Sequence, residues 1–223
     1  MVERKSKIEG PKLWGLLGGS FDPVHNGHIQ TAKAVQQQLQ LDKVLYLPAV
    51  RSPFKSASHA ANEHRAQMLR LALEGQEGLE LDVREFSRPP PSYTVDTLEE
   101  LNEQFPNKHW VLILGLDAWK SFPTWHQPER ILALVNIAVM SRPEYEKEHS
   151  NTLGETITSI ENFVSHPTGR VMELPVPSFD TSSTLIRNLI SDGEDYSEHL
   201  APDVVQYIQD NGLYNNLAIT ATK

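Results

Sequence analysis

A glycine-rich segment near the N-terminus carries the residue types of a polyphosphate site. Residues 18–28 read Gly-Gly-Ser-Phe-Asp-Pro-Val-His-Asn-Gly-His, directly after an apolar run and directly before a helical pattern. Paired glycines let a backbone approach a phosphate without a Cβ in the way. Asn26 or Asp22 is expected to cap the following helix, whose first free N–H groups attract anions. His25 and His28 lie three residues apart, so both imidazoles project to one side of the first helical turn.

A second helix start near the C-terminus offers similar chemistry. Asp180, Thr181 or Ser182 is expected to cap a helix over residues 183–190. Its free N–H groups and the neighbouring hydroxyls would then face an anion. Arg187 lies one turn further along, where its guanidinium can reach the same phosphates with several donors. Alone, such a run is only a good helix cap, but its order after the first segment favours a second half of one phosphate site.

These segments must be positioned by regular elements, and apolar runs alternate with helical periodicity along the chain. Strands are expected at residues 12–17, 43–48, 79–83, 110–114, 137–140 and 170–174. Helices are expected at residues 29–39, 59–73, 94–104 and 183–190, with a helical insertion within 150–166. Continuous apolar strands between helices indicate a parallel sheet covered on both faces. The sequence therefore predicts a doubly wound, Rossmann-like α/β fold that binds ligands at the carboxyl ends of its strands, followed by a small helical part.

The chain as a whole excludes several classes of function. It has 223 residues, no cysteine and a net charge of −9. The absence of cysteine excludes disulfides, thiolate zinc sites and a cysteine nucleophile, and the acidic balance argues against a nucleic-acid partner. No apolar stretch is long enough for a membrane span, and residues 1–10 do not resemble a secretory signal. We expect a cytoplasmic protein with a single domain at 1–214, whose helical part covers about 181–214, and a flexible tail at 215–223. The sequence leaves open whether copies assemble into a homo-oligomer.

The glycine-rich segment resembles the signature of the nucleotidyltransferase superfamily that carries a His-x-Gly-His motif. The similarity is greatest to the bacterial nicotinate-nucleotide adenylyltransferases. Residues 181–187 resemble the Ser-Ser-Thr-x-x-Arg motif of these enzymes. Further blocks in the family's order are found at residues 91–98, 115–117, 122–126 and 141–143. The resemblance extends from about Leu13 to Tyr214, nearly the whole chain.

This resemblance implies transfer of the adenylyl group of ATP to nicotinate mononucleotide, giving deamido-NAD and pyrophosphate. Mg²⁺ is implied as the companion of ATP, with no metal site of the protein's own. The residues implied in catalysis are His25, His28, Lys55 and Arg187. Those implied in ATP binding are Gly18, Gly19, Ser20, Phe21, Asp22, Gly115, Asp117, Arg142, Ser182, Ser183 and Thr184. Those implied in mononucleotide binding are Tyr93, Thr94, Trp125 and His126.

Within that site, the resemblance places the nicotinate ring on Trp125. Backbone N–H groups near Thr94 and His126 would meet its carboxylate, and Tyr93 and Trp119 are candidate walls. The loop after the second strand departs from the family, because residues 52–55 read Ser-Pro-Phe-Lys where a Pro-Pro-His-Lys-like run is usual.

Other functions stay open at this point. The acceptor could be nicotinamide mononucleotide, because the substituted loop lies near it. An idle nucleotide sensor on the same fold is the alternative from another class. A pantetheine-phosphate or cytidylyl-transfer relative, a zinc site on the two histidines and a general interaction domain are less favoured.

Overall fold

The computed structural model describes residues 12–50, 59–141 and 153–215. Its strands are β1 (Lys12–Gly19), β2 (Lys43–Pro48), β3 (Leu79–Leu81), β4 (Lys108–Gly115), β5 (Asn136–Ser141), β6 (Glu155–Thr156) and β7 (Arg170–Pro175). Its α-helices are α1 (Asn26–Leu39), α2 (Asn62–Leu73), α3 (Thr94–Gln104), α4 (Leu116–Ser121), α5 (Pro128–Leu132), α6 (Ile160–Ser165), α7 (Ser183–Asp192) and α8 (Pro202–Asp210). Short 3₁₀ turns lie at Arg84–Ser87, Phe122–Thr124 and Ser197–His199.

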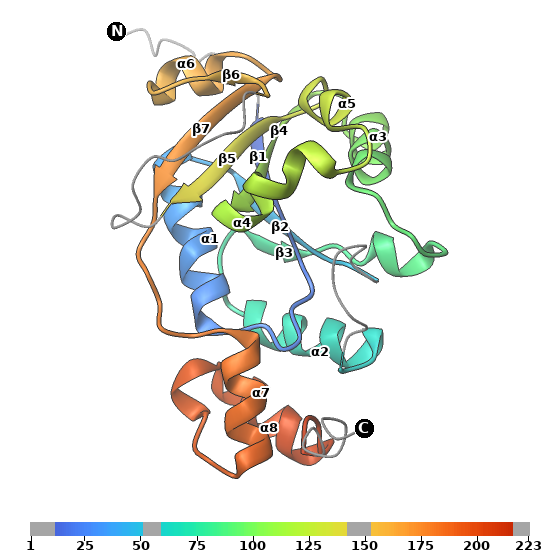
Figure 1. The fold of residues 1–223 in the computed structure, drawn as a ribbon, viewed down its shortest axis with the longest axis vertical. Coiled ribbons are helices and arrows are strands. Elements are labelled where there is room, and N and C mark those ends of the chain that lie inside the picture. Colours follow the sequence, from blue (N-terminus) through green and yellow to red (C-terminus); the bar gives the residue numbers. More distant parts are fainter. Residues whose placement is uncertain (1–11, 51–58, 142–152, 216–223) are drawn as a thin grey trace, which may run out of the picture.

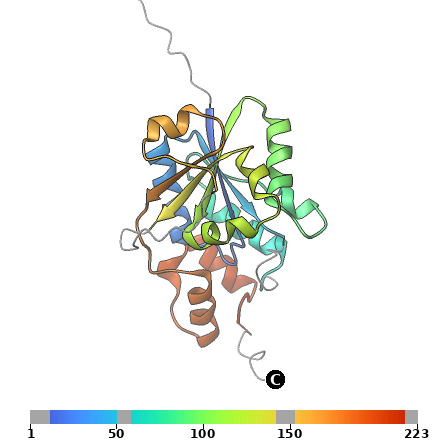
Figure 2. The ribbon, with the colours of Figure 1, turned by 45° about the horizontal axis from the view of Figure 1, so that its top comes forward.

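In this part of the chain the strands form one parallel sheet in the order β3-β2-β1-β4-β5-β7-β6 (Figure 1). The sheet has a hydrophobic core on each face. Neighbouring side chains of β1 belong to different cores, because successive residues of a strand point to opposite faces. Leu13 and Leu17 pack with α1, α2, α6, α7 and α8, whereas Leu16 packs with α3, α4 and α5. Figure 2 shows α1 and α6 on one side of the sheet and α3 on the other. The predicted doubly wound α/β fold is confirmed.

Two predicted elements differ by a few residues from the observed helix and strand. The helix expected at 59–73 begins at Asn62, because the N–H groups of His59 and Ala60 donate to the carboxylate of Asp22 instead. The strand expected at 79–83 ends at Leu81, since the Asp82 carboxylate binds the backbone N–H of Arg84 and starts a 3₁₀ turn.

The insertion expected within 150–166 contains a helix, α6, as predicted, and also the two-residue edge strand β6. Residues 150–152 lie outside the described part. Of the tail expected at 215–223, only Asn215 belongs to the described residues.

The C-terminal helices α7 and α8 lie beyond the carboxyl ends of the strands (Figure 1). α8 packs on α2, through a hydrogen bond of 2.9 Å between the Tyr207 hydroxyl and His64 Nδ1 and through buried Val204 and Ile208. Among the described residues, no helix is both long and apolar enough to cross a membrane.

Candidate active site

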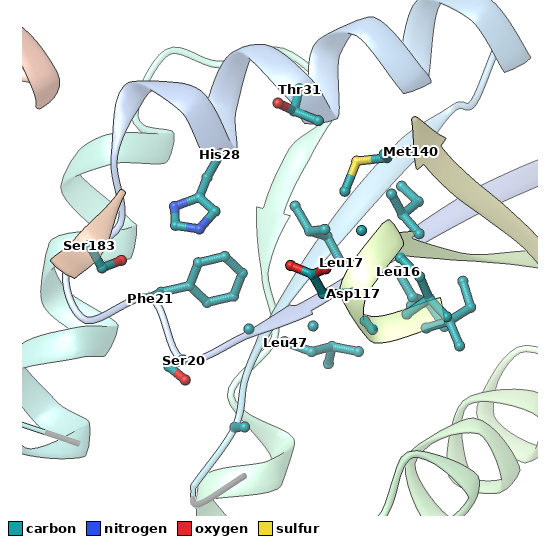
Figure 3. Close-up of a pocket in the computed structure, with 18 of the residues that line it drawn as sticks. Leu16, Leu17, Ser20, Phe21, His28, Thr31, Leu47, Asp117, Met140 and Ser183 are labelled. Carbon is teal, nitrogen blue, oxygen red and sulfur yellow. The ribbon is translucent and has the colours of Figure 1, made fainter. Parts of the chain in front are cut away.

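A cleft of about 1500 Å³ opens where β1 and β4 end. In a parallel sheet these ends share one edge, so segments far apart in sequence meet there. Figure 3 shows Asp117 on α4 projecting into the same space as His28 on α1. The predicted site residues that line the cleft are Gly18, Gly19, Ser20, Phe21, Asp22, His25, His28, Tyr93, Thr94, Gly115, Asp117, Trp125, His126, Ser183, Thr184 and Arg187.

Three predicted site residues are not among those lining residues. Ser182 is the N-cap of α7, and its hydroxyl accepts a hydrogen bond of 3.1 Å from the N–H of Leu185. It shapes the helix start instead of lining the cleft. Lys55 and Arg142 lie outside the described residues.

The two glycines at the end of β1 have different surroundings. A Cβ on Gly18 would meet no atom within 4 Å, so this position leaves open space beside the cleft. A Cβ on Gly19 would lie 2.9 Å from the ring of Phe21, which is buried. Phe21 itself has a φ of +48°, a left-handed conformation that is uncommon for a residue with a side chain. Gly19 therefore makes room for the ring, and Gly18 leaves room for a ligand.

His25 and His28 cap α1 through each other. The N–H of His28 donates to Nδ1 of His25 over 3.3 Å, and the N–H of His25 donates to Nδ1 of His28 over 3.2 Å. The two rings stack with their centroids 3.6 Å apart. Because both Nδ1 atoms accept, a proton carried by either ring lies on Nε2. The capping pair thus prepares two Nε2–H donors at the cleft.

The expected caps, Asn26 and Asp22, were wrong. His25 is the N-cap, the Asn26 amide donates to the carbonyl of Glu198, and the Asp22 carboxylate binds the N–H groups of His59 and Ala60. Burial, with a smaller contribution from the charge of His199, lowers the pKa of His25 from 6.5 to about 4. His25 is therefore neutral at pH 7.

This lowered pKa predicts a specific loss of stability in acid. The unfolded chain takes up a proton at His25 near pH 6.5 and the folded chain only near pH 4, so the stabilisation is complete above pH 6.5 and is lost as the pH falls to 4. The expected loss is about 3 kcal/mol. Urea unfolding across this range should show it in the wild type and not in His25→Asn, whose side-chain oxygen can still cap the helix. Equal pH profiles for the two proteins would refute this assignment.

Side chains of α7 hold the glycine-rich loop from the other side. The Ser183 hydroxyl donates to the carbonyl of Pro23 over 2.8 Å, and Nη1 of Arg187 donates to the carbonyl of Asp22 over 2.6 Å. Nη2 of Arg187 donates to the Thr184 hydroxyl over 3.2 Å. The two helix starts that the sequence singled out therefore meet across one loop.

An aromatic group lies at another part of the cleft. The rings of Tyr93 and His126 lie 4.3 Å apart, and Trp125 packs 5.5 Å from Phe122. Thr94 begins α3, whose N-terminus has no side-chain cap. Trp119 was expected as a further wall, but it is buried in the core and stacks on Phe122.

Several lining residues were not singled out from the sequence. Thr31 follows His28 by three residues on α1, a spacing that could have indicated it. His59 belongs to no recognised motif. Glu85 is buried beside Thr97, whose hydroxyl donates to its carboxylate over 3.0 Å; burial raises the pKa of Glu85, a shift opposed by that hydrogen bond and by the charge of Arg88.

Known proteins are similar to this chain in sequence and in fold. Residues 16–189 match the family model described as cytidylyltransferase-like. A Rhodopirellula baltica protein named a probable nicotinate-nucleotide adenylyltransferase is 39% identical over 206 residues, covering 90% of this chain and 92% of that protein. A Klebsiella pneumoniae protein of the same name is 35% identical over 214 residues, covering 93% and 99%.

Among solved structures, the fold is similar to a Plasmodium falciparum nicotinic acid mononucleotide adenylyltransferase complexed with NaAD. The TM-score is 0.69 at 17% identity, and the alignment covers 92% of this chain and 98% of that one. The same enzyme complexed with APC superposes with a TM-score of 0.67 over the same shares.

Proposed function

This chain belongs to the cytidylyltransferase-like family, and on that premise we propose that it is a nicotinate-nucleotide adenylyltransferase acting in the cytoplasm. The similarity to relatives of that name extends over nine tenths of the chain. In the proposed reaction, a phosphate oxygen of nicotinate mononucleotide attacks the α-phosphorus of ATP. The bond from this phosphorus to the bridging oxygen breaks, and pyrophosphate leaves with the electron pair.

The attacking oxygen is already an anion, so the protein needs to supply positioning and charge stabilisation rather than a base. We propose that Nε2–H of His25 and of His28 donate to the phosphates of ATP, with Gly18 leaving space for them. Arg187 and the hydroxyls of α7 would stabilise the phosphates from the other side. Lys55 and Arg142 keep their proposed roles as further cations of this site.

We assign the aromatic part of the cleft to the mononucleotide. Trp125 offers a flat ring on which the pyridine can stack. The uncapped N-terminus of α3 at Thr94 offers N–H groups to a carboxylate, and a helix start favours an anion. Asp117 would then bind a ribose hydroxyl or the adenosine edge of ATP.

The proposed reaction also implies Mg²⁺. In the described part of the chain no cluster of three or more His, Cys, Asp or Glu side chains could hold a metal ion. The Asp22 carboxylate already accepts bonds from the chain itself. We propose that Mg²⁺ enters the cleft bound to the phosphates of ATP, since this ion binds substrate phosphates with few protein ligands. There it would neutralise part of the phosphate charge.

The proposal rests on one observation: the two helix starts that we assign to the phosphates and the aromatic group line a single cleft. Wild-type protein supplied with ATP, Mg²⁺ and nicotinate mononucleotide is expected to release pyrophosphate in step with formation of the dinucleotide. Omission of the mononucleotide should abolish the release. A protein that binds ATP yet releases no pyrophosphate would instead be a nucleotide sensor.

A further inference from the structure

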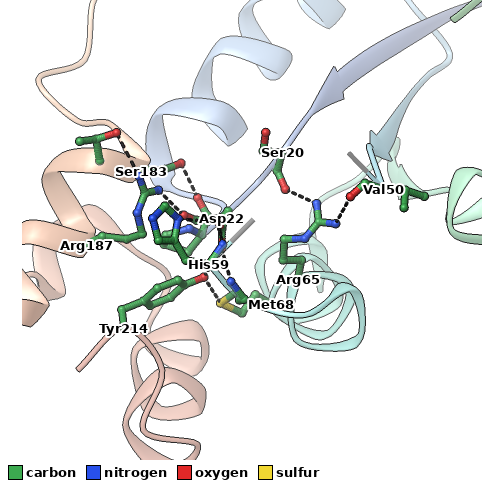
Figure 4. A network of polar contacts seen from close by, with 12 residues as sticks. Ser20, Asp22, Val50, His59, Arg65, Met68, Ser183, Arg187 and Tyr214 are labelled. Carbon is green, nitrogen blue, oxygen red and sulfur yellow. Dashed lines mark hydrogen bonds and ion pairs between the residues drawn. The ribbon is translucent and has the colours of Figure 1, made fainter. Parts of the chain in front are cut away.

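His59 lies on the wall of the cleft although it belongs to none of the motif segments. Its backbone N–H donates to Oδ2 of Asp22 over 2.6 Å, and its Nδ1 lies 3.2 Å from the same oxygen (Figure 4). Asp22 is only 3% exposed, whereas the His59 side chain is 35% exposed. One edge of the imidazole is therefore fixed on a buried carboxylate while the ring stays accessible from the cleft.

The partners of Asp22 define where the proton of His59 lies. Its Oδ1 accepts from the N–H of Ala60 over 3.0 Å and from the Tyr214 hydroxyl over 2.9 Å. Both carboxylate oxygens thus act as acceptors, and Nδ1 of His59 must donate. Within the described residues Nε2 of His59 forms no hydrogen bond, so this atom is the part of the ring left to meet a ligand.

We propose that His59 is a third phosphate-binding imidazole of the cleft, with Nε2 as the donor to the phosphate chain of ATP or to pyrophosphate. Each ring nitrogen donates when it carries a proton, Nδ1 to Asp22 on one side and Nε2 to the phosphate on the other. Arg187 brings a positive charge to the same cleft, where its Nη1 donates to the backbone carbonyl of Asp22. The identity of the anion as a nucleotide phosphate rests on the proposed function.

The competing explanation is that His59 only holds Asp22 in place. Two substitutions separate these roles, because each keeps one side of the ring. The side-chain amide of His59→Asn can reproduce the Nδ1 donor to Asp22 but has nothing at Nε2. The longer amide of His59→Gln reaches the position of Nε2 and gives up the bond to Asp22. His64→Asn is a matched control, since Nδ1 of His64 is also hydrogen-bonded, to Tyr207, but its side chain does not line the cleft.

The test measures the dissociation constants of Mg·ATP, inorganic pyrophosphate and adenosine by calorimetry for the four proteins. His59→Asn is expected to weaken Mg·ATP and pyrophosphate about tenfold, the loss of one charge-assisted hydrogen bond. His59→Gln should stay within about threefold of the wild type, and adenosine binding should be the same in all four.

Unchanged pyrophosphate affinity in His59→Asn would overturn the proposal, as would a greater loss in His59→Gln than in His59→Asn. Weakened adenosine binding in His59→Asn would also overturn it, since the effect would then not be specific to phosphate. Dinucleotide formation by the wild type is assayed in parallel. A wild type that binds Mg·ATP but forms no dinucleotide would contradict the proposed function alone, and the affinity comparison would still decide the role of His59.

Discussion

Replacing His28 with asparagine is expected to lower kcat by a factor of about 10²–10³, the usual effect of removing one donor that stabilises charge in a transition state. The expected loss follows from the position of Nε2, since Nδ1 is already used to cap the N–H of His25. The amide oxygen of asparagine can replace Nδ1 as that cap, so the helix should remain while the donor to the phosphates is lost.

Steady-state kinetics with nicotinate mononucleotide and ATP would measure this effect. His166→Asn serves as the control, because His166 follows α6 and does not line the cleft. The melting temperature of His28→Asn should lie close to that of the wild type. A kcat within threefold of the wild type would show that His28 has only a capping role.

The second large effect is expected on stability, in Asp22→Ala. The Asp22 carboxylate accepts hydrogen bonds from His59, Ala60 and Tyr214 and so joins three distant segments (Figure 4). Its removal leaves two backbone N–H groups, Nδ1–H of His59 and a hydroxyl without this acceptor. The free energy of unfolding should fall by about 3–5 kcal/mol, as when a buried charged partner is deleted.

Urea unfolding of Asp22→Ala and Tyr214→Phe at pH 7 would test this account. Tyr214→Phe loses one hydrogen bond and should cost only about 1–1.5 kcal/mol. Burial and the charge of Asp22 raise the pKa of Tyr214, so its hydroxyl remains a donor at this pH. A loss below 1 kcal/mol in Asp22→Ala would mean that the four donors find other partners at little cost.

The fold and the main parts of the site could be predicted from the sequence for a physical reason. The strands are continuous apolar runs, and a parallel sheet brings the residues after each strand to one edge. Gly18, His28, Asp117 and Arg187 therefore meet in one cleft although 169 residues separate the first from the last.

The other features of the site could not be predicted, because they depend on contacts between residues that are distant in sequence or on the orientation of side chains. The reciprocal cap of His25 and His28 requires the orientation of both rings, which spacing alone does not define. The sequence predicted that Asp22 caps a helix or contacts a ligand. Its carboxylate instead accepts a hydrogen bond from the hydroxyl of Tyr214, 192 residues away. His59 belongs to none of the motif segments, and its contact with Asp22 holds it at the wall of the cleft.

We propose that the cleft binds a mononucleotide whose ring carries a carboxylate, and the ratio of kcat/KM for nicotinate mononucleotide to that for nicotinamide mononucleotide measures this preference. Backbone N–H groups at the start of α3 can donate to both oxygens of a carboxylate, whereas an amide presents one acceptor and one donor. With ATP saturating, we expect a ratio of at least about ten, the value of one charge-assisted hydrogen bond. A ratio of one or below would contradict it.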